Sequence, residues 1–345
     1  MKIAIVFHKD PFKPANGMDL VRLRAISGGL IRQGLDVDVV SPMNKEGTLN
    51  GFIPVRPVSV LNQKGRYDVV KTSYHYSIKL VGAYDGPVLS RIVRVVDHIL
   101  PERDEPFRGE LLECQKLIRE RATALVLNNT ENETRWRALY GQKPPVVLIP
   151  NGCPVEIPAS RENPFDPEEP AILFLGSLAA PRMIDMINKA AERLQGKVKF
   201  HLVGLNKCGL YGGGDTCFPN RLIVDHGEMP ENEVWNYIQH ADIGLALATG
   251  PHAFDNDVSK IFNYLRGGLP VLTEDPILTN KLVKQTGLGK IFMYGNVDDL
   301  ISNALELLDN PMKQKKKEAV MKFMIEHHSW EKRVKDYALF LRSFI

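Results

Sequence analysis

The feature that most constrains the fold is an alternation of short β-branched segments with helical patterns, which runs along the chain twice. In the first series, "KIAIVF" and "DVDVVS" have the composition of strands, and the apolar spacing between them predicts a helix over 18–32. The same alternation continues to "VVLIP", near residue 150. Strands that alternate with helices indicate a parallel sheet covered on both faces, which is a doubly wound α/β fold.

The alternation stops in the proline-rich segment 151–170, and "AILFLGS" then opens a second series that ends with a helix near 298–308. A chain of 345 residues is also too long for one core of ordinary size. We therefore predict two Rossmann-like domains, over 1–153 and 154–325, that face each other across a cleft. A C-terminal helix over 326–345 is expected to pack back on the first domain. Ligands of such domains bind beyond the carboxyl ends of the strands.

Composition excludes several classes of function. Apolar residues make up 44% and charged residues 25% of the chain, as in ordinary globular proteins. The net charge of +3 is small and dispersed, and no nucleic-acid-binding motif is present, so no nucleic-acid partner is expected. The sequence has no signal peptide and no apolar run of about 18 residues, which predicts a cytoplasmic protein. The lysine-rich run 313–317 predicts a solvated face, and peripheral contact with the anionic inner face of a membrane is the alternative.

Two junctions between a strand and a helix carry residues suited to an anion. Gly17, in "HKDPFKPANGMDL", opens a helix, where backbone N–H groups meet anions, although an ordinary turn explains it as well. The spacing lacks G-x-G-x-x-G, so a dinucleotide site is not predicted. Arg182, in "GSLAAPRMIDM", lies beside another helix start, where dipole and guanidinium together would hold a phosphate. A surface arginine is the alternative.

The stretch "DNDVSKIFNYLRGGLPVL" gives the strongest physical indication of a bound phosphate. Asp255, Asp257, Ser259 and Lys260 lie directly before or at the start of a buried helix. Capping of the helix explains one of them, Ser259 or Asp257. A lysine at a helix start opposes the helix dipole unless an anion is there to meet it.

Other polar residues suggest catalysis more weakly, and none predicts a metal. Asp97 and His98, in "VVDHILPERDE", come just after a strand of the first domain and are expected to face the cleft. No spaced set of His, Cys, Asp and Glu ligands and no G-x-S-x-G elbow is present. A metal at Asp255 and Asp257, or a disulfide or half metal site at Cys208 and Cys217, is a minor alternative.

In their order and spacing, several segments together resemble one known family over nearly the whole chain. These segments are "IPNGCPV", "ILFLGSL", "FHLVG", "HGEMPENEVWNYIQHADIGLAL", "SKIFNYLRGGLPVL" and "HHSWEKRVKDY". They resemble the retaining family 4 glycosyltransferases, which have the GT-B fold of two Rossmann-like domains. The resemblance implies an acceptor-side first domain and a second domain that binds a nucleotide sugar.

The resemblance also implies roles for residues near the transferred sugar. The family has two glutamates separated by seven residues, and their positions here are held by Asp255 and Asn263. The resemblance places Asp255 at the donor sugar and Asn263 at the nucleotide ribose. Asp97 and His98 match the family's catalytic "HD" region in reversed order.

A second group of residues is implied for the diphosphate and the base. Of the two cations in the family's diphosphate clamp, one position is Arg182 and the other is Ser177, so one cation is missing. Lys260 is placed to replace it, beside Ser259, and Gly17 matches the family's glycine loop. The base is implied to lie against the main chain of two residues, Glu228 and Met229.

The expected activity is transfer of a hexosyl group from a nucleotide diphosphate, most commonly UDP, to a hydroxyl acceptor. The resemblance implies retention, no metal, no cofactor, and a carbohydrate or lipid-linked acceptor in glycan, polysaccharide or glycolipid synthesis. Two alternatives stay open. The replaced glutamates keep open a non-catalytic GT-B subunit that binds nucleotide sugar or scaffolds a partner enzyme, and a nucleotide-sugar epimerase would act without any acceptor.

Overall fold

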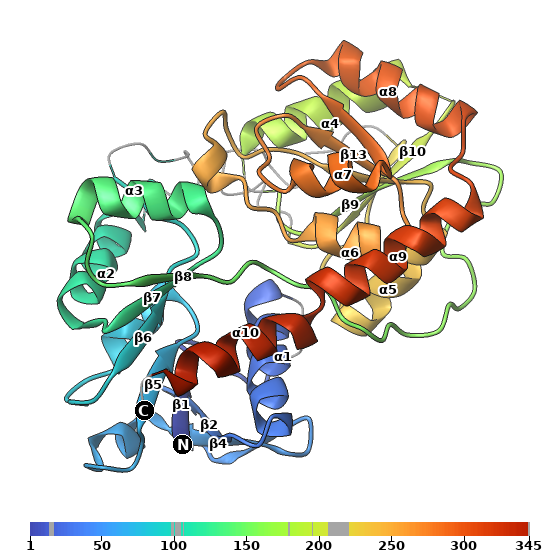
Figure 1. Ribbon diagram of the computed structural model, residues 1–345. Helices are drawn as coiled ribbons and strands as arrows, with labels where there is room; N and C mark the ends of the chain where they lie inside the picture. Colours follow the sequence, from blue (N-terminus) through green and yellow to red (C-terminus); the bar gives the residue numbers. More distant parts are fainter. Residues whose placement is uncertain are drawn as a thin grey trace. The chain divides into compact units, whose positions relative to one another are not determined.

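The chain forms two compact units in a computed structural model (Figure 1). The structure describes residues 1–13, 17–97, 100, 105, 107–178, 180–194, 196–205 and 221–343. Unit 1 consists of Met1–Asn151 and Trp330–Ile345, and unit 2 of Gly152–Ser329. The sequence-based boundaries, after residues 153 and 325, lie two residues after and four residues before the boundaries of these units.

Unit 1 is built on a sheet whose described strands follow the order β3-β4-β2-β1-β5-β6-β7-β8. All neighbours are parallel except β3, which pairs antiparallel with β4 at the edge. The central strand β1 places Ile3 opposite Val37 on one side and Val69 on the other. The strands are β1 (Lys2–Val6), β2 (Asp36–Ser41), β3 (Gly47–Leu49), β4 (Ile53–Pro57), β5 (Val69–Thr72), β6 (Val88–Arg91), β7 (Ala124–Leu127) and β8 (Val146–Leu148).

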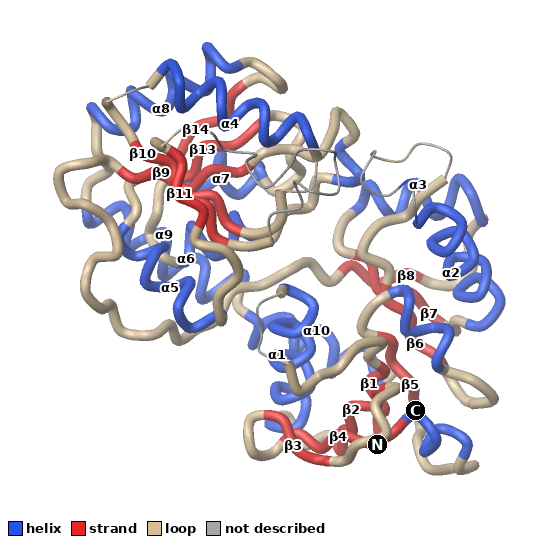
Figure 2. The backbone as a smooth tube through the Cα atoms, turned by 180° about the vertical axis from the view of Figure 1, so that it is seen from behind, coloured by secondary structure: helices blue, strands red, loops and turns tan. Residues whose placement is uncertain are grey.

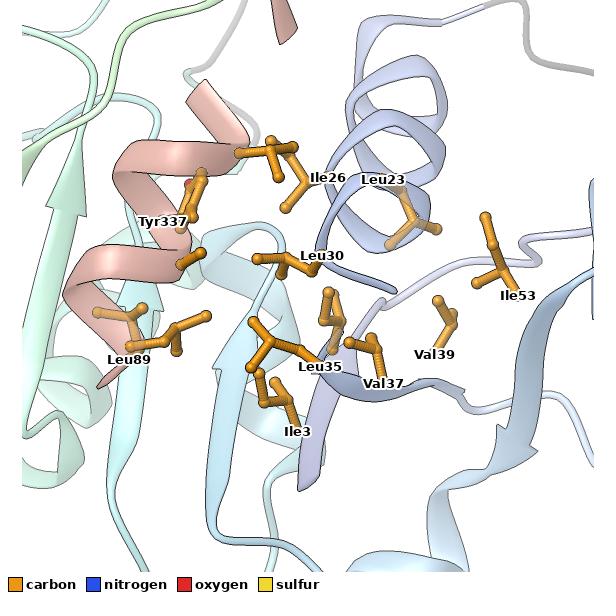
Figure 3. Packing of buried hydrophobic residues seen from close by; sticks show 14 of the residues in the cluster. Ile3, Leu23, Ile26, Leu30, Leu35, Val37, Val39, Ile53, Leu89 and Tyr337 are labelled. Carbon is orange, nitrogen blue, oxygen red and sulfur yellow. The ribbon is translucent and has the colours of Figure 1, made fainter. Parts of the chain in front are cut away.

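Helices cover both faces of this sheet. On one face, α1 (Met18–Arg32) and α10 (Trp330–Arg342) lie together over the sheet, with Leu23, Leu30 and Tyr337 pointing into the shared core (Figure 3). Close approach of the two helices needs Gly29, because a Cβ there would lie 2.3 Å from a methyl carbon of Val334. The other face carries η1 (Val58–Asn62), η2 (His75–Leu80), α2 (Arg108–Arg121) and α3 (Thr130–Tyr140).

Unit 2 contains a sheet in which every described strand is parallel to its neighbours, in the order β11-β10-β9-β12-β13-β14. A parallel sheet covered on both faces needs strands that are apolar throughout, and the central "AILFL" is buried at every residue. The strands are β9 (Ala171–Leu175), β10 (Lys199–Val203), β11 (Ile223–Asp225), β12 (Ile243–Ala246), β13 (Val271–Glu274) and β14 (Gly289–Phe292).

The helices of unit 2 form a layer on each side of these strands (Figure 2). One layer consists of α4 (Pro181–Arg193) and α8 (Val297–Asp309). The other consists of α5 (Glu231–His240), α6 (Lys260–Arg266), α7 (Asn280–Thr286) and α9 (Gln314–His328). A short 3-10 turn, η5 (Ala253–Asp255), precedes α6.

The predicted α/β fold with two doubly wound, Rossmann-like sheets is confirmed. The sequence did not predict β3, β4, β14 and α7, which are short. The C-terminal helix α10 is part of unit 1. No helix in the described ranges has the length and apolar character needed to cross a membrane.

Candidate functional site

The carboxyl edge of the unit 2 sheet brings three glycine turns together. Gly176, Gly204 and Gly227 follow β9, β10 and β11 with φ angles of +94°, +137° and +67°, which favour glycine. The Gly204 amide donates to the Gly227 carbonyl at 2.8 Å, and a Cβ on Gly204 would lie 2.5 Å from the Gly176 oxygen. The three turns therefore pack backbone against backbone at this edge, which side chains would prevent. This is the edge at which doubly wound sheets bind ligands.

Arg182 lies in the first turn of α4, as predicted, but its guanidinium turns toward the sheet. It forms a two-point ion pair with Glu274, one contact of which is 3.0 Å, and donates to the Ala248 carbonyl. The guanidinium carbon also lies 4.2 Å from the centroid of the Tyr294 ring. About a fifth of the side chain, 22%, is exposed, so a ligand has access to one side of it only.

Glu274 is a functional candidate that sequence reasoning missed. It ends β13, and its side chain is fully buried. Its carboxylate accepts from Arg182, from the Ala248 amide at 2.6 Å and from the Gly295 amide at 3.0 Å. A buried carboxylate needs such partners. It fixes the position of Arg182 and offsets the positive charge of that side chain.

Lys260 lies beside the glycine turns, as a phosphate ligand would. Its ammonium is 3.6 Å from the centroid of the buried Phe174 ring, and its Cε is 3.8 Å from where a Gly176 Cβ would be. The cation–π contact gives a local reason for a lysine at this helix start. The helix α6 has only 7 residues, and Ser259, at its N-cap, makes no side-chain capping bond. The ammonium, rather than a helix dipole, therefore supports an anion at this place.

The loop before α6 is held by a buried residue that the sequence argument passed over. The Asn256 amide donates to the Gly250 carbonyl at 2.9 Å and to the His252 carbonyl at 3.0 Å, while its oxygen accepts from Thr249. Asp255, in η5, and Asp257 are both half-buried on this loop. Asn263 is half-buried in the middle of α6. The predicted sugar and ribose residues thus lie on one continuous segment, in the loop and in the helix that follows it.

An aromatic cluster near the predicted base-binding residues combines His201 of β10, His226 just after β11 and Tyr237 of α5. The ring nitrogens of His201 and His226 lie 3.0 Å apart, and the Tyr237 hydroxyl lies 3.4 Å from His226. Burial lowers the pKa of His201 to about 4, and it lowers the pKa of His226 as well. Both rings are therefore neutral near pH 7. The predicted residues follow at once: Glu228 is exposed, and Met229 packs against the core.

The predicted site residues of unit 1 have other partners in the structure. Gly17 is the N-cap of α1 with an extended φ of −135°, and the first turn already carries Asp19, which is paired with Lys9 at 2.6 Å. An anion there would meet the Asp19 carboxylate, so the structure gives no support to a phosphate at Gly17. Asp97 forms an ion pair with Arg135. His98 lies outside the described residues.

Metal ligands are not gathered anywhere in the described part of the chain, where no group of three or more His, Cys, Asp or Glu side chains could hold an ion. Asp257 contacts the Thr279 hydroxyl at 3.4 Å. Cys208 and Cys217 lie outside the described residues.

The whole fold resembles glycosyltransferases of known structure. Sucrose-phosphate synthase from Thermosynechococcus elongatus superposes with a TM-score of 0.76 at 13% identity, over 99% of this chain and 98% of that one. HepE from Anabaena, in complex with UDP and glucose, gives 0.75 at 13% identity, over 99% and 100%. WaaG, a glycosyltransferase involved in lipopolysaccharide biosynthesis, gives 0.67 at 16% identity, over 97% and 98%. No family model and no curated protein sequence matches the chain.

These likenesses show that the chain has the GT-B fold, as the sequence predicted. Because the identities are low, they show the fold alone. Membership of the retaining family 4 stays a prediction.

Proposed function

We propose that the protein is a glycosyltransferase that moves a hexosyl group from a UDP-sugar to a hydroxyl acceptor in glycan, polysaccharide or glycolipid synthesis. The observation that carries this proposal is the set of cations and glycine turns at the carboxyl edge of the unit 2 sheet. Lys260 lies there beside the turn at Gly176, and Arg182 is held by Glu274 at the end of β13. The GT-B fold supports it, since HepE, which shares that fold, was solved with UDP and glucose.

In this proposal each polar residue of the segment takes one part of the donor. The Lys260 ammonium binds the diphosphate with Ser259 beside it, and Arg182 adds the exposed side of its guanidinium. Asp255 accepts from a sugar hydroxyl, and Asn263 hydrogen-bonds the ribose without the charge assistance that a glutamate would give. The base lies against the main chain of two residues, Glu228 and Met229.

The chemical task of the site is to stabilise the negative charge that grows on the departing diphosphate. Preorganised cations and backbone amides do this at little reorganisation cost. Glu274 offsets part of the charge of Arg182, so Arg182 alone is not expected to neutralise the diphosphate, and Lys260 acts with it. We propose that these side chains act without a metal or cofactor and that the configuration of the transferred sugar is retained.

One observation favours a second candidate, a non-catalytic subunit that binds nucleotide sugar. Arg182, the one cation shared with the family's clamp, is ion-paired with a buried carboxylate. The neighbouring positions Asp255 and Asn263 also lack the family's glutamates. Such a protein would bind a nucleotide sugar but release no sugar from it.

Calorimetric titration with UDP, GDP and ADP, with and without magnesium, tests the donor site. We expect metal-independent binding of UDP. We expect Lys260→Ala to weaken it by about 10- to 100-fold, as loss of a charged hydrogen bond of about 1.5–3 kcal/mol implies. Lys260→Arg keeps the charge and is expected to lose less. Lys281→Ala, which removes an exposed lysine of α7, is the matched control and should bind UDP as the wild type does.

Three outcomes separate the candidates. Binding of UDP with slow release of glucose from UDP-glucose supports the transferase. Tight binding with no release, even after long incubation, supports the non-catalytic subunit. Binding of none of the three nucleotides would overturn the donor site itself.

A further inference from the structure

The strand order of unit 1 marks a second place where a ligand is expected. From β1 the chain continues to β2 and β4 on one side, and from β5 it continues to β6, β7 and β8 on the other. The carboxyl ends of β1 and β5 therefore flank the point where the winding of the sheet reverses. Open α/β sheets bind ligands in the crevice at that point. His8 comes two residues after β1, and Tyr74 comes two residues after β5.

Three half-buried rings gather at this point. The rings of His8 and Tyr74 stack with centroids 5.3 Å apart and planes at 18°. Tyr76 lies 5.5 Å from His8 and 5.7 Å from Tyr74. The buried His75 ring contacts both tyrosine rings, with centroid distances of 4.2 and 4.4 Å. Each of the three rings keeps part of its surface exposed, so together they form a ring cluster rather than a closed core.

The polar atoms of the cluster are suited to a neutral hydrogen-bonding ligand. In the part of the chain that the structure describes, Nδ1 of His8 and both ring nitrogens of His75 are buried without a hydrogen-bond partner. Burial, with a smaller contribution from Lys9, lowers the pKa of His8 to about 4. A neutral imidazole has one donor and one acceptor, which match the two roles of a hydroxyl group.

Two lysines at this edge are already paired with acids. Lys9 is paired with Asp19 at 2.6 Å, and Lys79 with Glu113 at 2.8 Å. Arg91, which is buried, donates to the Ser73 carbonyl and to the Asn128 side chain, and burial first, then the charges of Arg94 and Arg91, lowers the pKa of His75. We therefore infer the kind of ligand from the aromatic rings and not from the charges at this edge.

We propose that the ring cluster of His8, Tyr74 and Tyr76 is a binding platform for a neutral pyranose ring. One apolar C–H face of the sugar lies on the tyrosine rings, and a hydroxyl of its rim bonds to His8. Aromatic side chains with an apolar face and a polar edge suit ligands of this mixed character. That this sugar is the acceptor of the transfer rests on the proposed function, whereas its binding does not.

Saturation-transfer NMR with the methyl α-glycosides of glucose, galactose and mannose tests the platform. At least one glycoside should take up magnetisation from the wild type. Tyr74→Leu should raise the Kd for that glycoside about 3- to 10-fold, which corresponds to the loss of one aromatic ring contact. Tyr74→Phe keeps the ring and should keep the binding. Tyr76→Leu is a second variant should the first not fold. Phe52→Leu, at an exposed aromatic of the same unit, is the control and should change nothing.

The inference is overturned if no glycoside binds the wild type, or if Tyr74→Leu and Tyr76→Leu both bind as well as Tyr74→Phe. It is also overturned if methyl glucuronide or glucose 6-phosphate binds and the neutral glycosides do not. Titration of UDP on the same samples keeps the two proposals apart. If UDP binds and no glycoside does, the sugar platform is refuted and the donor site is retained. If a glycoside binds and UDP does not, the protein binds sugars but the proposed transferase activity is refuted.

Discussion

Lys71 is a buried cation whose removal should stabilise the protein. It lies on β5 with a relative exposure of 2%, and its ammonium is 4.9 Å from the centroid of the Tyr337 ring. No carboxylate forms an ion pair with it among the described residues, and its hydrogen bond to the Thr72 carbonyl is long, at 3.4 Å. Burial chiefly, with the nearby charges of Arg22 and Arg91, lowers the pKa of Lys71 from 10.5 to about 8, although Tyr337 acts in the opposite direction.

The size and the pH range of the effect follow from that lowered pKa. Below about pH 8 the lysine is charged in both the folded and the unfolded chain, and folding carries the full cost of burying the charge. The difference between pKa values of 10.5 and about 8 corresponds to about 3 kcal/mol. Between these pH values the folded protein releases a proton that the unfolded chain keeps. The contribution of Lys71 to the free energy of unfolding therefore rises with pH between about 8 and 10.5, and it is constant above about 10.5.

Lys71→Met is the perturbation, because methionine fills a similar volume without a charge. At pH 7 we expect the variant to gain up to about 3 kcal/mol in the free energy of unfolding, less any loss of packing. Urea unfolding followed by circular dichroism, repeated from pH 7 to pH 10.5, measures the gain and its decline. Lys281→Met, at an exposed lysine, is the control and should show no such dependence.

The neighbouring Tyr337 hydroxyl can also ionise, so either Lys71 or Tyr337 could lose the first proton as the pH rises. Burial alone would raise its pKa, but Lys71, Arg22 and Arg91 together lower it, so the lysine and the tyrosine titrate as a pair. The absorbance of tyrosinate, compared between wild type and Tyr337→Phe, shows whether the phenol or the ammonium ionises first. If Lys71→Met destabilises the protein by the same amount at every pH, the buried-charge argument is wrong and the side chain acts only through packing.

Two further predictions concern buried polar groups of unit 2. Tyr264→Phe should lower the free energy of unfolding by about 1–3 kcal/mol in urea titrations with an unchanged m-value, because the buried Leu175 amide, 2.8 Å from the hydroxyl, loses its acceptor; an unaltered midpoint would contradict this. Arg182→Met should cost about 3–5 kcal/mol by leaving the Glu274 carboxylate buried and unpaired, and adding Glu274→Gln should recover part of that loss. Additive losses in the same unfolding assay would show that the two side chains do not act as a pair.

Local periodicity was enough for the long elements and failed where a neighbouring strand sets the length. The helix predicted over 18–32 has the bounds of α1, because apolar residues such as Leu23, Ile26 and Leu30 recur at helical spacing. In the apolar run 88–96, by contrast, only Val88–Arg91 forms a strand that pairs with its neighbours. Strand length depends on the partner, since β5 and β7 are equally short. That information is not in the run itself.

In the candidate site, sequence reasoning likewise found charged residues that are neighbours along the chain and missed an ion pair between distant residues. Asp255, Ser259 and Lys260 were predicted together because they adjoin in sequence. Glu274 was missed because it is 92 residues from Arg182 in the sequence, and no motif near either residue indicates that they form an ion pair.

Lys260 is the more instructive case. A lysine that opposes a helix dipole was taken to need an anion, but the structure supplies the face of Phe174. A ring attracts a cation without cancelling its charge, whereas a carboxylate such as Glu274 offsets it. The ion pair with Glu274 therefore reduces the positive charge that Arg182 brings to this edge of the sheet. A lysine at a helix start is therefore not by itself evidence of an anionic ligand, because the fold can bring it a partner such as Phe174 from far along the chain.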